Sequence, residues 1–364
     1  MTTGLVWHES YWRHDPGAGA GVLPAGPWVP PGEPVDSAEP KRRLKALLDA
    51  SGFTAKLHPI EAREATHGQL ARVHTRGYLA RVREASAAGG GEVGPMARIG
   101  AGGYAIAALA AGGVIAAIDA VLARRVDNAY AFVRPSGHHA TADAGMGFCV
   151  FSNAAIGALH ALEQHGLARI ALVDWDVHHG NGAQAVFWND PRALTVSLHQ
   201  DGTFPRHTGS VAERGEGRGA GTNLNIPLPP GCTGAAYRAA FERVILPALE
   251  RFRPELIVVP CGYDAGFQDP LSRMMLGPED FRWMAETIAA AARSLCQGRL
   301  VLCQEGGYSA STVPFLGLPV FEALSGMSSG VPNPVAELFA TIPHRGLLAH
   351  QEAAVEAARR AAEV

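Results

Sequence analysis

The segment at residues 172–182, LVDWDVHHGNG, places Asp174, Asp176 and His178 at alternating positions. The apolar run IALV at 170–173 predicts that a β-strand enters this segment. If the strand continues, alternate side chains point to one side of it. Two carboxylates crowded on one face are costly to bury unless a positive charge lies among them. The segment therefore predicts a bound cation.

A third ligand for that cation is available in GYDAG, where Asp264 follows the apolar run ELIVVPC. Asp176, His178 and Asp264 would supply two oxygens and one nitrogen, and leave a position open for water or substrate. Three protein ligands are typical of a catalytic zinc site, although Fe²⁺ or Co²⁺ would suit the same donors. Taken alone, Asp264 would more often be a turn residue, so the prediction depends on the neighbouring DWDVHH run.

A tandem pair of histidines, His138 and His139, stands in the segment RPSGHH. Such a pair at the end of a strand, close to carboxylates, indicates proton transfer. An imidazole needs its far nitrogen held to fix its tautomer. Asp174 is the natural partner for one of the pair, and Asn181 for the other.

Tyr308, in the segment EGGYS, follows the paired glycines 306 and 307. A phenol on such a flexible turn can donate a hydrogen bond to an oxyanion as charge develops, although a loop tyrosine more often only packs. Together with the metal and the histidines it would form a hydrolytic site. The metal would polarise a carbonyl and a water, a histidine would take the proton, and Tyr308 would stabilise the tetrahedral oxyanion.

The elements that position these groups follow from the apolar runs AYAFV, RIALVDW, ALTVSL, ELIVVPCG and RLVLCQ, most of which are separated by Ala-rich helical segments. Continuous apolar strands that alternate with helices predict a parallel sheet covered on both faces. Each polar cluster follows one of these runs. Because the carboxyl ends of parallel strands form the ligand crevice, the clusters should converge.

Composition narrows the class of protein. The chain has 364 residues, 47% hydrophobic and 18% charged, with a formal net charge of −3. This is typical of a globular protein and gives no support to direct nucleic-acid binding. The five cysteines lack C-x-x-C spacing and are expected to be buried thiols in a reducing compartment. Because the N-terminus lacks a secretory signal pattern, we expect a cytoplasmic protein.

Two segments differ from the rest. Residues 13–40 are rich in Gly and Pro, and we expect a long irregular loop without secondary structure of its own. Residues 101–123 are apolar but contain four glycines and an aspartate, so they predict a buried core helix rather than a membrane span. We find no internal repeat and expect one domain over residues 1–364.

Six motifs in order, RPSGHH, MGFCVFSNAAI, LVDWDVHHGNG, TVSLHQDGTFP, GYDAGFQDPL and QEGGYS, resemble the zinc-dependent histone deacetylase superfamily. Asn181, where class I enzymes usually have Asp, looks class II-like. The long N-terminal loop and the KRRL, NDP and RMM stretches most resemble bacterial histone deacetylase-like amidohydrolases. The resemblance implies a single-domain α/β fold of the arginase/deacetylase type, with a mostly parallel sheet flanked by helices on both faces.

The resemblance also implies site roles. It gives zinc, one catalytic ion per chain, to Asp176, His178 and Asp264. His138 and His139 take the proton-transfer roles, with Asp174 as the partner of His138 and Tyr308 at the oxyanion. The resemblance further implies a potassium ion held by the side chains of Asp174 and Ser197 with carbonyls of Asp176, His178 and Leu198, and an acyl-lysine tunnel walled by Phe148 and Phe204 with the Gly147 carbonyl near the substrate amide.

The substrate follows from the rim of that tunnel. Acetylpolyamine deacetylases of the superfamily carry acidic groups for their cationic substrate, in one subgroup a Glu at the position of Leu271. An apolar rim residue favours acyl-lysine, in a peptide, protein or other small acyl amide, over an acetylpolyamine. An acidic residue that grips the substrate backbone in many members would fall near Glu92, where the flanking residues match poorly.

Three alternatives remain at this point. An acetylpolyamine amidohydrolase would share the chemistry and differ only in substrate. A binuclear manganese ureohydrolase of the arginase type would need further metal-bridging carboxylates, such as a D-x-H-x-D run, where this chain has DVHHGNG. A non-catalytic acyl-lysine binding module would not need the full set of ligands, histidines and Tyr308. The resemblance also favours a homo-oligomer and gives no indication of a membrane partner.

Overall fold

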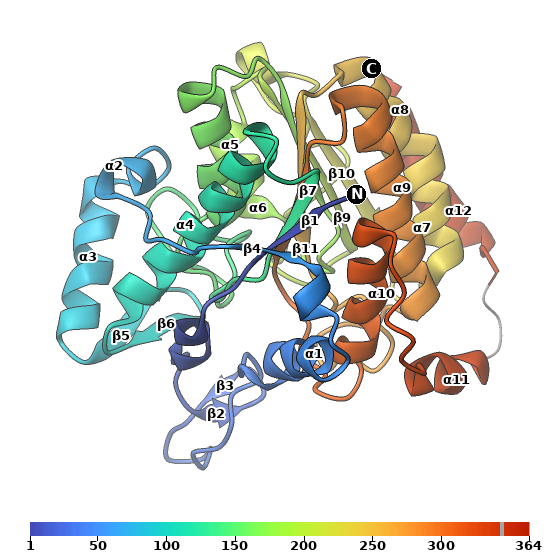
Figure 1. Ribbon diagram of the computed structural model, residues 1–364. Coiled ribbons are helices and arrows are strands. Elements are labelled where there is room, and N and C mark those ends of the chain that lie inside the picture. The colour runs from blue at the N-terminus through green and yellow to red at the C-terminus, as the bar shows by residue number, and fades with distance from the viewer. Residues whose placement is uncertain (343–345, 364) are drawn as a thin grey trace.

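The computed structural model describes residues 1–342 and 346–363. Eight strands form one central sheet in the order β10-β9-β8-β11-β12-β7-β1-β4 (Figure 1). Every pairing in it is parallel. The strands are β1 (Thr3–Val6), β4 (His58–Ile60), β7 (Asn128–Ala131), β8 (Ile170–Asp174), β9 (Ala193–Gln200), β10 (Asn223–Leu228), β11 (Leu256–Cys261) and β12 (Leu300–Gln304).

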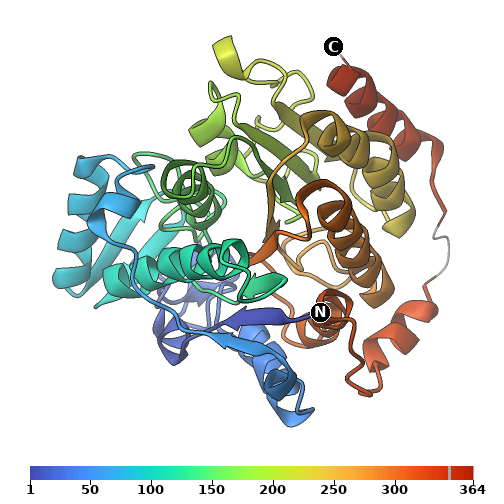
Figure 2. The same ribbon diagram turned by 45° about the horizontal axis from the view of Figure 1, so that its top comes forward.

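Helices cover both faces of this sheet. On one side lie α4 (Gly103–Leu122), α5 (Asn153–Gln164) and α6 (Asn181–Phe187), and on the other lie α7 (Gly234–Ala240), α8 (Leu246–Phe252), α9 (Pro278–Cys296), α10 (Val313–Ser325) and α12 (Ala349–Glu363) (Figures 1 and 2). The peripheral helices are α1 (Glu39–Ala50), α2 (His67–Leu70), α3 (Arg76–Ala87) and α11 (Pro334–Ala340). The predicted α/β fold with a covered parallel sheet is confirmed.

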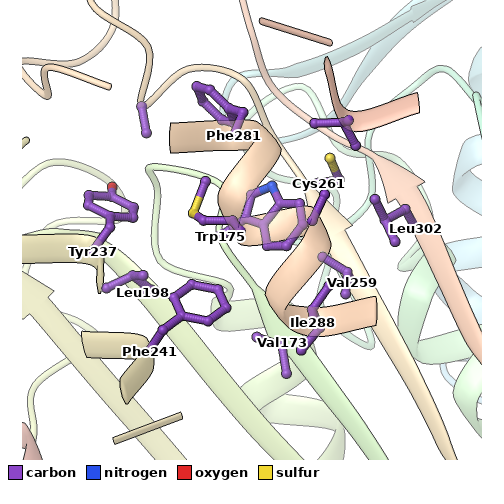
Figure 3. Packing of buried hydrophobic residues seen from close by; sticks show 14 of the residues in the cluster. Val173, Trp175, Leu198, Tyr237, Phe241, Val259, Cys261, Phe281, Ile288 and Leu302 are labelled. Atoms are coloured by element: carbon purple, nitrogen blue, oxygen red, sulfur yellow. The ribbon is translucent and has the colours of Figure 1, made fainter. Parts of the chain in front are cut away.

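The strands are apolar throughout because both of their faces are buried. In β8, Ala171 and Val173 belong to the core beneath α9, whereas Leu172 belongs to the core beneath α4 and α5. Figure 3 shows the first of these cores, where Trp175 and Val173 pack against Phe281 and Ile288 of α9. Such two-sided burial removes the alternation of polar and apolar residues seen in half-exposed strands.

Helix α4 is the predicted core helix. It is long and apolar enough to cross a membrane by length and composition alone, but 72% of its most apolar window is buried inside the molecule. Its small residues allow close packing. A Cβ on Gly112 would lie 1.8 Å from the carbonyl oxygen of Arg63, so only glycine fits there.

Some local predictions were wrong. β8 ends at Asp174, so Asp176 and His178 lie in a bend beyond the strand rather than on its continuation. Within residues 13–40, two very short strands, β2 (Gly19–Ala20) and β3 (Leu23–Pro24), pair with each other. A second hairpin, β5 (Gly90–Gly94) and β6 (Ala97–Gly100), lies outside the main sheet. All five cysteines are free and buried, as predicted.

Candidate active site

Three buried side chains meet beyond the carboxyl ends of β8 and β11. Asp176 and His178 come from the bend after β8, and Asp264 from the turn after β11. Their ligand atoms all lie within 4.8 Å of one another. The convergence of strand ends thus brings together the three residues that the sequence nominated for a metal.

The trio combines two carboxylates with one imidazole. The Nδ1 atom of His178 lies 3.0 Å from Asp176 Oδ1 and 3.1 Å from Asp264 Oδ2. Burial opposes a charge on His178, but its hydrogen bonds to Asp176 and Asp264 outweigh burial and raise its pKa to about 10. Among the described residues, no lysine or arginine forms an ion pair with either carboxylate. The donor set of two carboxylates and one imidazole therefore fits a divalent metal ion, which would take the place of the proton on His178.

Backbone groups hold the two carboxylates in place. Asp176 accepts hydrogen bonds from the N–H groups of His178 (2.9 Å) and Gly306 (2.8 Å), and Asp264 accepts one from Val177 (2.9 Å). Metal ligands are commonly oriented by such outer contacts. Here they also connect the bend after β8 to the loop after β12.

The two histidines lie side by side, with ring centroids 3.9 Å apart, but have different partners. His138 Nδ1 lies 3.0 Å from Asp174 Oδ2, and His139 Nδ1 lies 2.8 Å from Asn181 Oδ1. Burial acts to lower the pKa of His138, but the charges of Asp176 and Asp174 outweigh it and hold that pKa well above its usual value. Burial and the charge of His138 lower the pKa of His139 well below its usual value.

Glu305 holds the backbone of the segment that carries the two histidines. The sequence did not predict this role. Its Oε2 atom accepts the N–H groups of Gly137 (2.7 Å) and His138 (3.2 Å). Burial raises the pKa of Glu305 to about 7. Glu305 lies within the QEGGYS motif, but only the fold shows which backbone it holds.

A narrow pocket of about 270 Å³ leads to these residues. Phe204 is a wall of it, with its ring 4.9 Å from that of His139, and Phe148 is another, 5.9 Å from the ring of Tyr308. A Cβ on Gly147 would lie 2.6 Å from His139, so glycine is needed there. The lining residues are Val22, Met96, His139, Gly147, Phe148, His178, Thr203, Phe204, Arg206, Leu271 and Tyr308.

Tyr308 reaches this pocket from the loop after β12. Its backbone N–H donates to Asp269 Oδ2 at 2.8 Å, a contact that sequence reasoning missed although Asp269 belongs to the GYDAGFQDPL motif. Burial and the neighbouring charge of Asp264 raise the pKa of Asp269 to about 7. The Asp269 carboxylate also accepts the N–H of Leu271 at 2.9 Å.

The residues nominated for potassium also lie close together. Asp174 on β8 and Ser197 on β9 are register partners in the sheet. The Ser197 hydroxyl accepts the N–H of Gly180 at 3.1 Å, and Leu198 follows it on the buried β9 strand. The bend that carries Asp176 and His178 begins directly after Asp174.

The pocket opens beside a second cavity. A second cavity of about 460 Å³ adjoins it and shares Val22, Met96 and Phe148 with it. The exposed Glu92 lines this outer cavity rather than the pocket that contains the histidines. Arg206 follows Phe204 and Pro205 in the chain. Among the residues described as lining the inner pocket, it is the one lysine, arginine, aspartate or glutamate.

Comparison with known proteins places this site in a family. The histone deacetylase domain matches residues 36–322. A histone deacetylase-like amidohydrolase of Pseudomonas aeruginosa is 50% identical over 338 residues, which cover 92% of this chain and 89% of that protein. Human polyamine deacetylase HDAC10 is 38% identical over 290 residues, which cover 76% of this chain and 43% of that protein. The crystal structure of the HDA15 HD domain matches with a TM-score of 0.84 at 28% identity, and the match covers 100% of this chain and 96% of that one.

The chain therefore belongs to the histone deacetylase domain family. It is a hydrolase that acts on amide bonds, as its deacetylase and amidohydrolase relatives indicate. The family, the fold and this class of enzyme are confirmed.

Proposed function

We propose that the protein is a zinc-dependent deacylase that removes acetyl or related acyl groups from the ε-amino group of lysine. The observation that supports it most is that one pocket is lined by the buried His139 and His178, by Tyr308, and by the aromatic rings of Phe148 and Phe204. Its volume of about 270 Å³ lies below the roughly 300–1,000 Å³ of typical small-molecule sites. A linear acylated side chain suits such a space.

Asp176, His178 and Asp264 would hold the metal ion. When bound, zinc would polarise the substrate carbonyl and acidify a water molecule. Fe²⁺ or Co²⁺ would find the same mixed oxygen and nitrogen donors. Three ligands with one bound ion also distinguish this proposal from a binuclear manganese ureohydrolase, for which two ions per chain are expected.

The histidines divide the proton transfers. If the Nδ1–H of His139 donates to Asn181, the Nε2 atom of His139 is free to accept the proton of the attacking water. A lowered pKa keeps His139 neutral, as a general base must be. His138, held by Asp174 and biased toward its charged form, would stabilise negative charge beside it.

Tyr308 would donate its phenolic proton in a hydrogen bond to the substrate carbonyl oxygen as that oxygen becomes negative. Its ring lies beside those of Phe148 and His178, at centroid distances of 5.9 and 6.5 Å. The full complement of histidines, metal ligands and tyrosine argues against a non-catalytic binding module.

A potassium ion is the second cofactor of this proposal. Asp174 and Ser197 would provide a carboxylate and a hydroxyl, and Asp176, His178 and Leu198 would provide carbonyl oxygens. Such hard oxygen donors suit an alkali or alkaline-earth cation better than a soft metal. By sharing Asp174 with His138, the ion would help to hold that histidine.

The rim supports acyl-lysine as the substrate. Leu271 and Thr203 are uncharged, and Arg206 would repel the free ammonium groups of an acetylpolyamine. The carboxylates of Asp15 and Glu92 line the outer cavity on the far side of Phe148. Because the chain is similar to a polyamine deacetylase, acetylpolyamines are the second candidate substrate.

A substrate panel tests the proposal. The zinc-loaded protein is assayed with an acetyl-lysine peptide, longer acyl-lysine peptides, acetylputrescine and acetylspermidine. We expect the lysine peptides to show the higher kcat/KM. Acetylpolyamines turned over faster by orders of magnitude would contradict the substrate, and no hydrolysis of any of these amides would contradict the enzyme activity. Light scattering on the same sample tests the expected homo-oligomer.

A further inference from the structure

We propose that Asp269 is a positioning residue for Tyr308. Its carboxylate holds the Tyr308 backbone and thereby determines where the phenolic oxygen lies in the pocket. The inference rests on the proposed function, because it takes Tyr308 as the donor to the oxyanion.

The Asp269 carboxylate is committed to two backbone groups. One oxygen accepts the N–H of Tyr308 at 2.8 Å, and the other accepts the N–H of Leu271 at 2.9 Å. Asp269 is buried, with 7% of its surface exposed. Among the described residues, no lysine, arginine or histidine forms an ion pair with it. Because a buried carboxylate is costly, its two charge-assisted bonds to backbone groups matter for its placement.

Tyr308 depends on such an anchor because little else fixes its backbone. It follows Gly306 and Gly307, the second with φ of 118°, a conformation in which glycine is favoured. The residues from 305 to 309 belong to no helix or strand. The Gly306 N–H is held by Asp176 at 2.8 Å, so the loop is fastened on both sides of Gly307.

The phenol itself has only loose restraints. Among the described residues, none forms a hydrogen bond with the Tyr308 hydroxyl. Its ring contacts those of Phe148 and His178, and the Nζ atom of Lys41 lies 4.8 Å from the ring centroid. Because no hydrogen bond holds the hydroxyl, the placement of the Tyr308 backbone contributes directly to where the phenolic oxygen lies.

The same carboxylate reaches the rim of the pocket. Leu271, whose N–H it accepts, lines the same pocket as Tyr308. Asp269 thus connects two residues that line the pocket, and a substrate in the pocket would contact both of them. A change at Asp269 should therefore alter KM as well as kcat.

The test is a double-mutant cycle with Asp269→Asn and Tyr308→Phe. The amide of Asn keeps the size of the side chain but can accept only one of the two N–H groups through its oxygen. A misplacement of about 1 Å can cost about 100-fold in rate, so we expect kcat for an acetyl-lysine peptide to fall about 10- to 100-fold in the Asn variant. In the Tyr308→Phe background the same change should cost less than about twofold, because residues acting through one group are not additive.

Controls separate positioning from general damage. Ser272→Ala, a buried change three residues further along, should leave kcat unchanged, and bound zinc and the thermal midpoint are measured for every variant. If Asp269→Asn does not fold, Asp269→Ser, which keeps an acceptor, replaces it in the cycle. Equal fold losses in the two backgrounds would overturn the positioning role. Near-normal activity of Tyr308→Phe alone would instead refute the role of the tyrosine in the proposed function.

Discussion

Two groups of aspartate and histidine in this molecule look alike by distance alone. Asp176, His178 and Asp264 have ligand atoms within 4.8 Å of one another, and so do Asp119, His160 and His165 between α4 and the end of α5. The first group, which we call the strand-end trio, is completely buried. The second, the helix trio, is partly exposed.

The two trios differ in how their charges are met. In the helix trio, Asp119 Oδ1 lies 2.8 Å from His160 Nε2 and 2.7 Å from His165 Nε2, and Arg63 lies 3.4 Å from its other oxygen. An Arg72 nitrogen lies 3.3 Å from His160 Nδ1, so that nitrogen must accept and Nε2 carries the proton given to Asp119. One carboxylate is thus surrounded by donors. The strand-end trio has two carboxylates for one imidazole.

The comparison teaches that proximity alone does not define a metal site. A buried group with unmet negative charge needs a cation, whereas a partly exposed group whose hydrogen bonds are complete does not. The helix trio is therefore interpreted as a structural connection between α4 and α5. Variants in the two trios should separate activity from stability.

The largest expected effect is on metal binding by the strand-end trio. Asp264→Asn removes one of the two charges proposed to hold the ion, and we expect bound zinc to fall from one ion per chain to near zero. Loss of metal catalysis, worth several kcal/mol, should lower kcat/KM by about 1,000-fold or more. Metal content by mass spectrometry and activity with an acetyl-lysine peptide measure both.

The matched control is His165→Ala in the helix trio, which should retain one ion per chain and full activity. If this variant also lost an ion, or if the unmodified protein bound two, the distinction between the trios would be wrong.

The second largest effect is expected for Tyr308, which lies beside the proposed metal site but is not one of its ligands. Tyr308→Phe removes the phenol that we propose as a donor to the developing oxyanion, and loss of one such donor costs about 100- to 1,000-fold in kcat. Zinc content should stay at one ion per chain. Near-normal turnover, or loss of zinc together with activity, would each contradict the role given to the phenol.

A smaller effect, on stability, is expected in the helix trio. His160→Ala removes a hydrogen bond to the Asp119 carboxylate and leaves the Arg72 nitrogen without that partner. Hydrogen bonds to charged groups contribute about 1.5–3 kcal/mol, and partial exposure reduces this, so we expect the free energy of unfolding to fall by about 1–2 kcal/mol. Urea unfolding measures the change. Unchanged stability with reduced activity would reverse the interpretation of this trio.

The sequence was sufficient to predict the strand-end trio because its members directly follow apolar strands, and the ends of parallel strands meet. It did not reveal Asp269 or Glu305 as anchors, because their partners are backbone N–H groups distant in the chain, 39 residues away in the case of Asp269 and Tyr308. The strands β1, β4 and β10 were also missed, and β10 (NLNIPL) contains two asparagines and a proline that interrupt its apolar pattern. β1 and β4 have four and three residues, too few for a periodic pattern to emerge.

The smallest predicted effect lies at the mouth of the pocket, where charge should choose among substrates without touching the chemistry. Arg206 is exposed there, and no described residue forms an ion pair with it. Exposed charge pairs are worth about 1 kcal/mol or less, so Arg206→Glu should raise kcat/KM for acetylspermidine relative to an uncharged acetyl-lysine peptide by about two- to fivefold. Added salt should shrink the difference, because it screens exposed charges. Arg206→Gln should show an intermediate change. An unaltered ratio in both variants would mean that the outer cavity, with Asp15 and Glu92, governs the choice of substrate instead.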